Sequence, residues 1–263
     1  MTTKVKTHAA VLCGGRGERL RPLTDYFQKV MIPIGPKKLP LLAYVIGLLE
    51  RHGVDRITLL TGYRSEDVMR YFGDGAGHGV TLTYSEDAED QRGSLNAVAN
   101  ALKGGKIPAC DELLVYYGDV LSDLDVTSLL RTHRRKRADV TLVLFRGYAL
   151  PVGTARVGRA GLVGSVHEKP TLKVNVTTGS MVLGPEAIRL ARGMASSANT
   201  DLMTHLLPAA LKKGLRVAAF FTSEAWYDVG TVSSFEKLDM EIQNHPPSFL
   251  PIPWEEPSEA RKP

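Results

Sequence analysis

A glycine-rich loop near the amino terminus holds the residues whose types and spacing are best suited to chemistry. The stretch VLCGGRGERLRPLTD occupies residues 11–25 and places three glycines just before Arg19. Glycines let backbone N–H groups approach an anion closely, and the arginine adds a positive charge. Neither standard phosphate loop is present: Leu20 stands where the third glycine of GxGxxG belongs, and no GK[ST] triplet follows. We therefore expect a longer loop that binds an anion in its own way.

A lysine and two aspartates follow where they can meet this loop. Lys29 lies ten residues beyond Arg19 in the extended segment QKVMIPIG, and such a lysine can fold back over bound phosphates. Asp119 ends the apolar strand ELLVYYGD, so we expect it at the carboxyl edge of the sheet, where oxygen ligands suit Mg²⁺. Asp228, in AWYDVGT, needs a counter-charge that a metal shared with Asp119 would provide. Considered alone, Lys29 could equally be an ordinary surface lysine, and Asp119 could be a helix-capping or turn residue.

A second charged pair, Glu168 and Lys169, lies in VHEKP at 166–170, where a predicted strand meets a proline turn. A carboxylate can bind sugar hydroxyls and a lysine can bind a phosphate. An exposed ion pair at a turn fits the local sequence equally well. Asp123 and Asp125 immediately precede a predicted helix, which favours a capping role for them.

Apolar runs alternate with helical patterns up to about residue 145, which is typical of a mostly parallel sheet covered by helices. Beyond Pro151 the sequence changes to short β segments separated by glycines. The predicted strands are 8–13, 56–62, 79–85, 112–119, 138–145, 152–157, 162–168, 179–184, 216–221 and 225–229. The predicted helices are 39–53, 65–72, 94–102, 125–135, 201–214 and 233–243. No internal repeat is visible, so we predict one α/β domain over 1–243 and a Pro-rich tail at 244–263.

Composition narrows the class of protein. The chain has 263 residues, 43% of them apolar, and a net charge of +5, which suits a packed core and acidic small-molecule ligands. The one dense basic run, 131–137, lies where a helix should end and cations are favourable, so we expect no nucleic-acid binding. Cys13 and Cys110 lack metal-binding spacing and are expected to be reduced thiols. Without a signal-peptide pattern or a long apolar run, we expect a cytoplasmic protein that binds no membrane.

Taken in order, these motifs resemble those of the sugar nucleotidyltransferases, also called NDP-sugar pyrophosphorylases. The family loop reads GGxGxRLxPLT, and the chain matches it at Gly14, Gly15, Gly17, Arg19, Leu20, Pro22, Leu23 and Thr24. The resemblance covers about residues 8–243 and implies a Rossmann-like, GT-A-like mixed sheet flanked by helices. It also implies an Mg²⁺-dependent reaction in which a sugar 1-phosphate attacks the α-phosphorus of an NTP, and assembly into a homodimer or homotetramer.

The resemblance assigns roles to individual residues. It implies that Arg19, Lys29, Asp119 and Asp228 are catalytic and that Asp119 and Asp228 bind Mg²⁺. The implied nucleotide-binding residues are Leu12, Gly14, Gly15, Gly17, Arg19, Lys29 and Gly93. The implied sugar-phosphate-binding residues are Gly153, Glu168, Lys169 and Gly179. The chain departs from the family pattern at Gln28–Lys29–Val30, where PKP is usual, and at Thr177, where an asparagine is usual.

The identity of the base is less constrained. Segment 118–144 looks most like guanylyltransferases that act on mannose or heptose 1-phosphates, while RLRPLT is shared with thymidylyl and uridylyl relatives. Two other classes remain as alternatives: a metal-dependent glycosyltransferase that uses Asp123 and Asp125, and a non-catalytic subunit that binds a nucleotide sugar. The first would need its aspartates nearer the strand end, and the second should lack the phosphate-binding residues that this chain retains.

Overall fold

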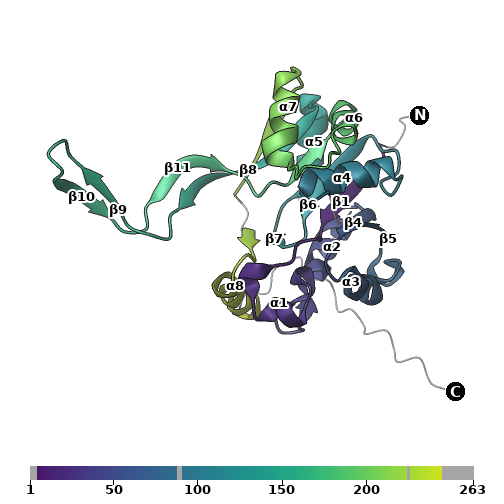
Figure 1. Cartoon of the computed structure of the whole chain (residues 1–263), viewed down its shortest axis with the longest axis horizontal. Helices are drawn as coiled ribbons and strands as arrows, with labels where there is room; N and C mark the ends of the chain where they lie inside the picture. The colour runs from purple at the N-terminus through teal and green to yellow at the C-terminus, as the bar shows by residue number, and fades with distance from the viewer. Residues whose placement is uncertain (1–4, 88–90, 224–225, 245–263) are drawn as a thin grey trace.

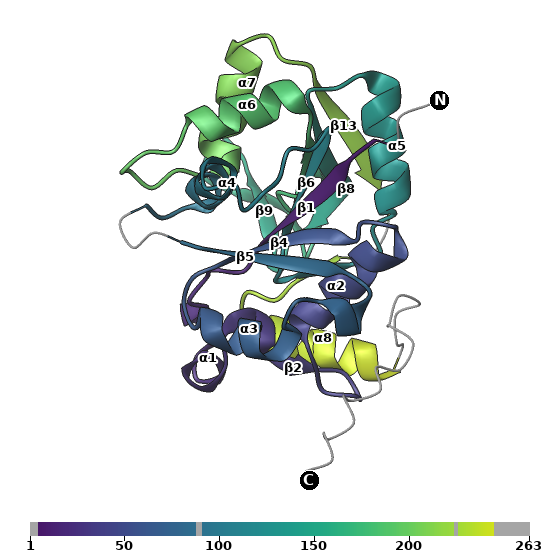
Figure 2. The same ribbon diagram turned by 90° about the vertical axis from the view of Figure 1, so that its right-hand side faces the viewer.

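The computed structural model describes residues 5–87, 91–223 and 226–244. Its centre is an eight-stranded sheet in the order β11-β8-β12-β6-β1-β4-β5, with β13 paired to β8 (Figure 1 and Figure 2). Its strands are β1 (Thr7–Leu12), β4 (Arg56–Thr61), β5 (Thr81–Glu86), β6 (Glu112–Tyr117), β8 (Val140–Ala149), β11 (Thr171–Val176), β12 (Met181–Leu183) and β13 (Val217–Thr222). The strand pairs β6–β1, β1–β4, β4–β5 and β8–β13 are parallel, whereas β12 and β11 run antiparallel to their neighbours. The predicted α/β class with a mixed, mostly parallel sheet is confirmed.

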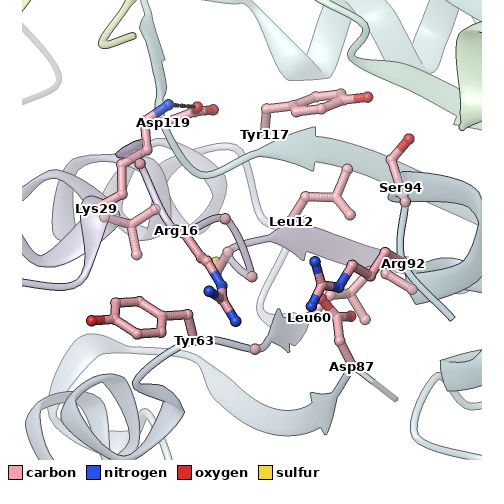
Figure 3. Close-up of a pocket in the computed structure, with 18 of the residues that line it drawn as sticks. Leu12, Arg16, Lys29, Leu60, Tyr63, Asp87, Arg92, Ser94, Tyr117 and Asp119 are labelled. Atoms are coloured by element: carbon pink, nitrogen blue, oxygen red, sulfur yellow. Dashed lines mark hydrogen bonds and ion pairs between the residues drawn. The ribbon is translucent and has the colours of Figure 1, made fainter. Parts of the chain in front are cut away.

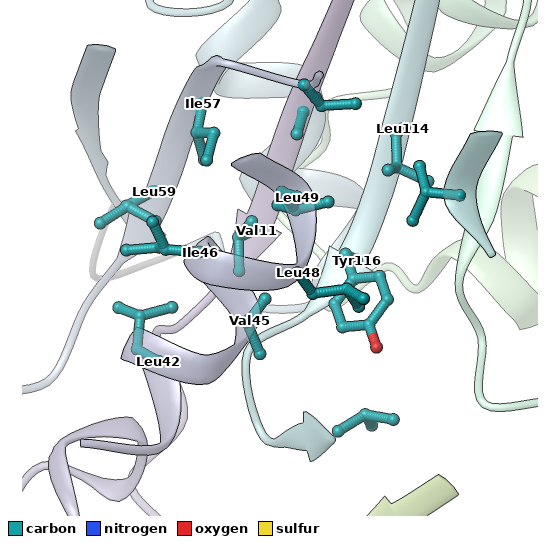
Figure 4. Close-up of a cluster of buried hydrophobic side chains, with 14 of the residues drawn as sticks. Val11, Leu42, Val45, Ile46, Leu48, Leu49, Ile57, Leu59, Leu114 and Tyr116 are labelled. Carbon is teal, nitrogen blue, oxygen red and sulfur yellow. The ribbon is translucent and has the colours of Figure 1, made fainter. Parts of the chain in front are cut away.

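Helices cover both faces of the sheet because its central strands are apolar on both sides. They are α1 (Leu23–Tyr26), α2 (Leu41–Arg51), α3 (Ser65–Phe72), α4 (Ser94–Lys103), α5 (Val126–Lys136), α6 (Pro185–Gly193), α7 (Leu207–Lys212) and α8 (Val232–Asn244). Val11 of β1 packs with α2 in one buried cluster (Figure 4), and the adjacent Ala10 packs with α4 in the other. This alternation follows the period of two of a strand. It places α2 and α3 on one side of the sheet and α4, α6 and α7 on the other (Figure 2).

The structure differs from the predicted elements at several points. Residues 39–40 form a strand, β3 (Leu39–Pro40), paired with β2 (Pro33–Ile34), so α2 begins only after Pro40. Strand β7 (Val120–Ser122), which pairs with β14 (Trp226–Asp228), as well as helix α6 and strand β11, had no predicted counterpart. The predicted helix 201–214 is split into a π-helical turn, η4 (Leu202–Leu206), and α7. Pro208 has no N–H to donate to the preceding turn, which accounts for the change of hydrogen-bonding pattern.

Residues 146–176, which we call the arm, project from the body of the molecule (Figure 1). The arm consists of the outer parts of β8 and β11 and a distal hairpin formed by β9 (Thr154–Val157) and β10 (Val163–His167). It corresponds to the glycine-punctuated segments predicted beyond Pro151. The sequence pattern gave no indication that they extend away from the sheet.

Other sequence predictions can be checked directly. Cys13 and Cys110 are free thiols. The basic run 131–137 ends α5, where Arg134 pairs with Glu112 at 2.6 Å. No described helix is long and apolar enough to cross a membrane. The predicted Pro-rich tail, apart from Asn244, lies outside the described residues.

Candidate active site

A cavity of about 1230 Å³ opens at the carboxyl ends of β1, β4 and β6 (Figure 3), the place where open α/β sheets bind ligands. Its walls come from the loops that follow these strands and from the residues that lead into α4. All the residues expected to bind the nucleotide line it: Leu12, Gly14, Gly15, Gly17, Arg19, Lys29 and Gly93. The glycine loop after β1 therefore faces an open, ligand-sized space.

The glycines of this loop are needed for two different reasons. Gly17 has a left-handed φ of 65°, which strongly favours glycine, whereas a Cβ on Gly14 would lie 2.3 Å from Oδ2 of Asp87 and would require that carboxylate to move. Thr24 fixes the turn by donating a hydrogen bond to the Gly17 carbonyl at 2.9 Å. A Cβ on Gly15 would meet no atom within 4 Å, so glycine there leaves the backbone open to the cavity.

The four residues predicted to be catalytic lie close together: Arg19, Lys29 and Asp119 line one edge of the cavity, and Asp228 lies beside them. The Lys29 ammonium forms an ion pair with Oδ2 of Asp119 (Figure 3). Strand β14 brings Asp228 opposite Val120, and the Val229 N–H donates to the Asp119 carbonyl at 3.1 Å. Arg19 reaches the same place. A Cβ on Gly230 would lie 3.3 Å from Nη2 of Arg19 and 3.4 Å from Oδ1 of Asp228, so Gly230 leaves room for both side chains.

The electrostatics of this cluster favour a bound cation. The Asp228 side chain keeps contact with solvent, yet the protein around its carboxylate and the charge of Asp119 raise its pKa, and Lys29 and Arg19 partly oppose this rise. No group of three or more His, Cys, Asp or Glu side chains among the described residues could hold a metal ion. Mg²⁺ commonly uses only one or two carboxylates and completes its shell with phosphates and water. The Asp119–Asp228 pair fits an Mg²⁺ ion that arrives with a nucleotide.

Gln28, where the family usually has proline, holds Lys29 in place. Its side chain is fully buried, donates from Nε2 to the Cys13 carbonyl, and accepts from the Val30 N–H at 2.7 Å. The second bond caps the single turn η2 (Lys29–Met31), which carries the lysine. Gln28 thus ties this turn to the glycine loop.

Two further predicted glycines shape the walls of the cavity. Gly93 has a φ of 106°, and its Cβ would lie 2.2 Å from the Thr200 carbonyl oxygen. Gly179 has a φ of 87°, and its Cβ would lie 2.8 Å from the ring of Tyr117, which lines the cavity. Thr177, where asparagine is usual, accepts a hydrogen bond from the Gly179 N–H at 3.0 Å.

Several side chains that line the cavity were missed by the sequence reasoning: Arg16, Tyr63, Asp87, Arg92, Ser94 and Tyr117 (Figure 3). The Arg16 guanidinium lies 5.8 Å from the centre of the Tyr63 ring. Burial raises the pKa of the half-buried Asp87 to about 6. Tyr63 and Asp87 lie within two residues of the ends of the parallel strands β4 and β5, so the strand-end rule that identified Asp119 could also have found them.

The structure does not bring the predicted sugar-binding residues of the arm to this cavity. Gly153, Glu168 and Lys169 lie together where the β9–β10 hairpin joins β8 and β11: a Cβ on Gly153 would be 2.9 Å from Oε2 of Glu168. No residue of 146–176 is among those that line the cavity. Asp125 caps α5 by accepting from the Ser128 N–H at 2.8 Å, as its position before the helix predicted.

Comparison with known proteins agrees with this geometry. Residues 8–245 match the family described as nucleotidyl transferase. The chain is 31% identical over 255 residues to a UTP–glucose-1-phosphate uridylyltransferase of Synechocystis and 33% identical over 241 residues to a mannose-1-phosphate guanylyltransferase of Mycobacterium tuberculosis. These alignments cover 90% and 89% of this chain, which spans 64% of the length of each relative.

A solved structure has the same fold. HddC from Yersinia pseudotuberculosis, complexed with GMP-PN, matches with a TM-score of 0.67 and 20% identity over 90% of this chain and 100% of that one. The family match extends over almost all of the described residues, from the glycine loop to α8. The chain belongs to the nucleotidyl transferase family.

Proposed function

We propose that this protein is a sugar-1-phosphate nucleotidyltransferase, which converts an NTP and a sugar 1-phosphate into an NDP-sugar and pyrophosphate. The observation that carries the proposal is that Arg19, Lys29 and Asp119 line one edge of the cavity beside the glycine loop, with Asp228 next to them. A subunit that only bound a nucleotide sugar would need no such cluster of charges. The cavity, about 1230 Å³, exceeds the roughly 300–1,000 Å³ typical of a single small-ligand pocket, so it has room for two substrates.

The nucleotide would lie along the glycine loop. Residues 14–17 line the cavity, and Arg19 and Lys29 add two positive charges beside them. Mg²⁺ held by Asp119 and Asp228 would supply positive charge to the phosphates during transfer. When phosphates are present, the Lys29 ammonium can exchange its contact with Asp119 for one with a phosphate oxygen.

The chemistry requires no general base. The phosphate of a sugar 1-phosphate is already an anion at neutral pH, so its oxygen can attack the α-phosphorus directly. The difficulty lies in bringing two polyanions together and in balancing the charge that develops on the departing pyrophosphate. Fixed cations and backbone N–H groups in a partly enclosed cavity meet both needs.

We infer that guanine is the preferred base. Asp87 places a half-buried carboxylate against the glycine loop. The two acceptor oxygens of a carboxylate match the adjacent N1–H and N2–H₂ donors of guanine, a pair that uracil, thymine, cytosine and adenine lack. We therefore assign GTP as the preferred nucleotide and mannose or heptose 1-phosphate as the preferred acceptor, with UTP and dTTP as alternative donors.

A matrix of four NTPs against several sugar 1-phosphates, followed by pyrophosphate release, tests the proposal. GTP with mannose or heptose 1-phosphate should give the highest kcat/KM. Asp87→Asn should lower kcat/KM for GTP by about 10- to 100-fold, the loss expected for one charge-assisted contact, with Glu66→Gln, on α3 and outside the cavity lining, as the control. Failure of every pair to release pyrophosphate would refute the activity. A preference for UTP or dTTP that Asp87→Asn does not change would refute the base assignment alone.

A further inference from the structure

The arm exposes an unusual concentration of apolar surface. Eight of the sixteen large apolar side chains that are exposed among the described residues lie between 148 and 174. They are Tyr148, Val152, Val157, Leu162, Val163, Val166, Leu172 and Val174, and Leu162 is 73% exposed. A two-stranded ribbon has no second layer to cover such side chains, and isolated ribbons are marginally stable in water. The arm therefore needs a partner surface.

The arm also carries groups that the proposed reaction needs, and it carries them away from the cavity of its own chain. Strand β11 pairs with β8 from Val176, opposite Phe145, out to Thr171, opposite Ala149. Phe145 packs against Trp226 at the base of the arm, with ring centres 5.3 Å apart. At ~3.3 Å per residue, Lys169 lies roughly 20 Å along the ribbon from Val176. That span is several times the length of a lysine side chain.

We propose that the arm of one copy of this chain completes the sugar-phosphate half of the cavity of a second copy, and that the two copies exchange arms in a two-fold dimer. The inference rests on the proposed function, because it assigns Glu168 and Lys169 to the sugar phosphate. An exchanged arm gives each cavity the residues that its own chain holds at a distance. The same exchange buries the apolar side chains of both arms in one self-complementary interface.

Docking of the arm onto a second copy accounts for the β8–β11 pairing and for the exposed apolar side chains better than folding of the arm back onto its own cavity does. Two residue pairings at the base of the ribbon and two at its outer end, on either side of a bulge between Leu172 and Asn175, join β8 and β11, and a fold-back of the whole arm would have to disrupt them. The cavity wall is rich in charged and glycine residues, so it would not cover the apolar side chains of the hairpin.

The charge of the arm fits the same docking. The arm holds five cations, Arg146, Arg156, Arg159, Lys169 and Lys173, against the single carboxylate of Glu168. A cavity loaded with a triphosphate attracts such a segment. Nucleotide should therefore tighten the dimer.

Mixed dimers distinguish exchange from fold-back. Lys29→Met removes a residue of the cavity, and Lys169→Met removes a residue of the arm; each homodimer should retain below about 1% of wild-type turnover. A heterodimer purified through two different tags would hold one cavity with Lys29 that receives an arm with Lys169. Exchange predicts about half of the wild-type turnover per dimer, since one of two sites is intact. If each arm instead folds back onto its own cavity, both sites of the heterodimer are defective, and its turnover should be as low as that of the two variant homodimers.

The interface can be tested without reference to activity. Leu162→Asp combined with Val166→Asp should give a monomer in light scattering that still shows a thermal shift with GTP, because both side chains lie on the arm outside the nucleotide cavity. Leu211→Asp on α7, at a side chain 61% exposed and outside the arm, should remain dimeric and active.

These experiments distinguish failure of the proposed function from failure of the arm exchange. A wild-type protein that turns over no substrate pair overturns the proposed function and the arm exchange with it. A monomeric wild-type enzyme that is active, an inert heterodimer, or a fully active Lys169→Met variant overturns the arm exchange alone.

Discussion

Lys29 provides the sharpest perturbation of the proposed site. Its side chain is only 12% exposed, and its partner Asp119 is 24% exposed. Lys29→Met keeps the length and apolar character of the stem and removes the charge. We expect kcat to fall by about 10²- to 10³-fold, equivalent to about 2.7–4 kcal/mol, as when one preorganised donor to a developing charge is lost.

The same substitution should also change the pKa of Asp228 and the stability of the protein. Asp119 already raises the pKa of Asp228, and Lys29 opposes it, so the pKa of Asp228 should rise further in the variant. Breaking a fully buried pair costs about 3–5 kcal/mol. Because both carboxylates here keep access to water, we expect a loss of about 1–2 kcal/mol in the free energy of unfolding. Mg²⁺ alone should now stabilise the variant more than the wild type, since Lys29 no longer competes for Asp119.

Two measurements follow: pyrophosphate release at saturating substrates, and melting temperature against Mg²⁺ concentration. Lys38→Met is the matched control, because Lys38 is 60% exposed and pairs with Asp239 at 3.4 Å on the surface. It should change kcat less than about twofold. A folded Lys29→Met enzyme within fivefold of wild-type kcat would refute the reasoning, as would a Mg²⁺ response smaller than that of the wild type.

Three further perturbations test the cluster, the cavity wall and the core. Asp228→Asn should lower kcat by about 10²- to 10³-fold and weaken the stabilisation by Mg²⁺ with GTP; an unchanged melting curve would argue against a metal-binding role. Gly93→Ala should lower both stability and GTP affinity, because its Cβ would lie 2.2 Å from the Thr200 carbonyl oxygen; a normal GTP-dependent thermal shift would contradict this. Burial, with a smaller contribution from Arg56, lowers the pKa of His8 to about 4. The unfolded chain therefore binds this proton below pH 6.5 and the folded chain only below about pH 4, so stability should fall by up to about 3 kcal/mol as pH drops between these values. His8→Gln should flatten that slope in urea titrations, and an unchanged slope would exclude His8 as its source.

The position of Asp119 beside the glycine loop could be predicted from the sequence because both obey local rules. Asp119 follows a buried parallel strand, and the glycine loop follows another, so the sheet topology brings them to one edge. The role of Gln28 could not be predicted, because its hydrogen bond joins it to the carbonyl of Cys13, 15 residues away in sequence. Only the folded path of both loops puts these groups in contact.

The arm shows a second feature that the sequence could not predict. The glycine-separated segments 152–157 and 162–168 predict strands, and β9 and β10 are present there, whereas β11 was not predicted. Such a pattern cannot reveal whether another layer of the protein covers the strands. Because Glu168 and Lys169 lie on a ribbon with no such layer, the sequence indicated their chemistry but not their distance from Lys29 in the same chain.

The fate of the phosphate oxygens tests the proposed reaction most directly. Mannose 1-phosphate labelled with ¹⁸O at its three non-bridging phosphate oxygens is incubated with GTP, Mg²⁺ and the full chain, and the products are examined by mass spectrometry. Direct attack on the α-phosphorus predicts that the NDP-sugar retains all three labels and that the pyrophosphate carries none. Label in the pyrophosphate, loss of label from the NDP-sugar, or release of unlabelled pyrophosphate without any NDP-sugar would contradict it.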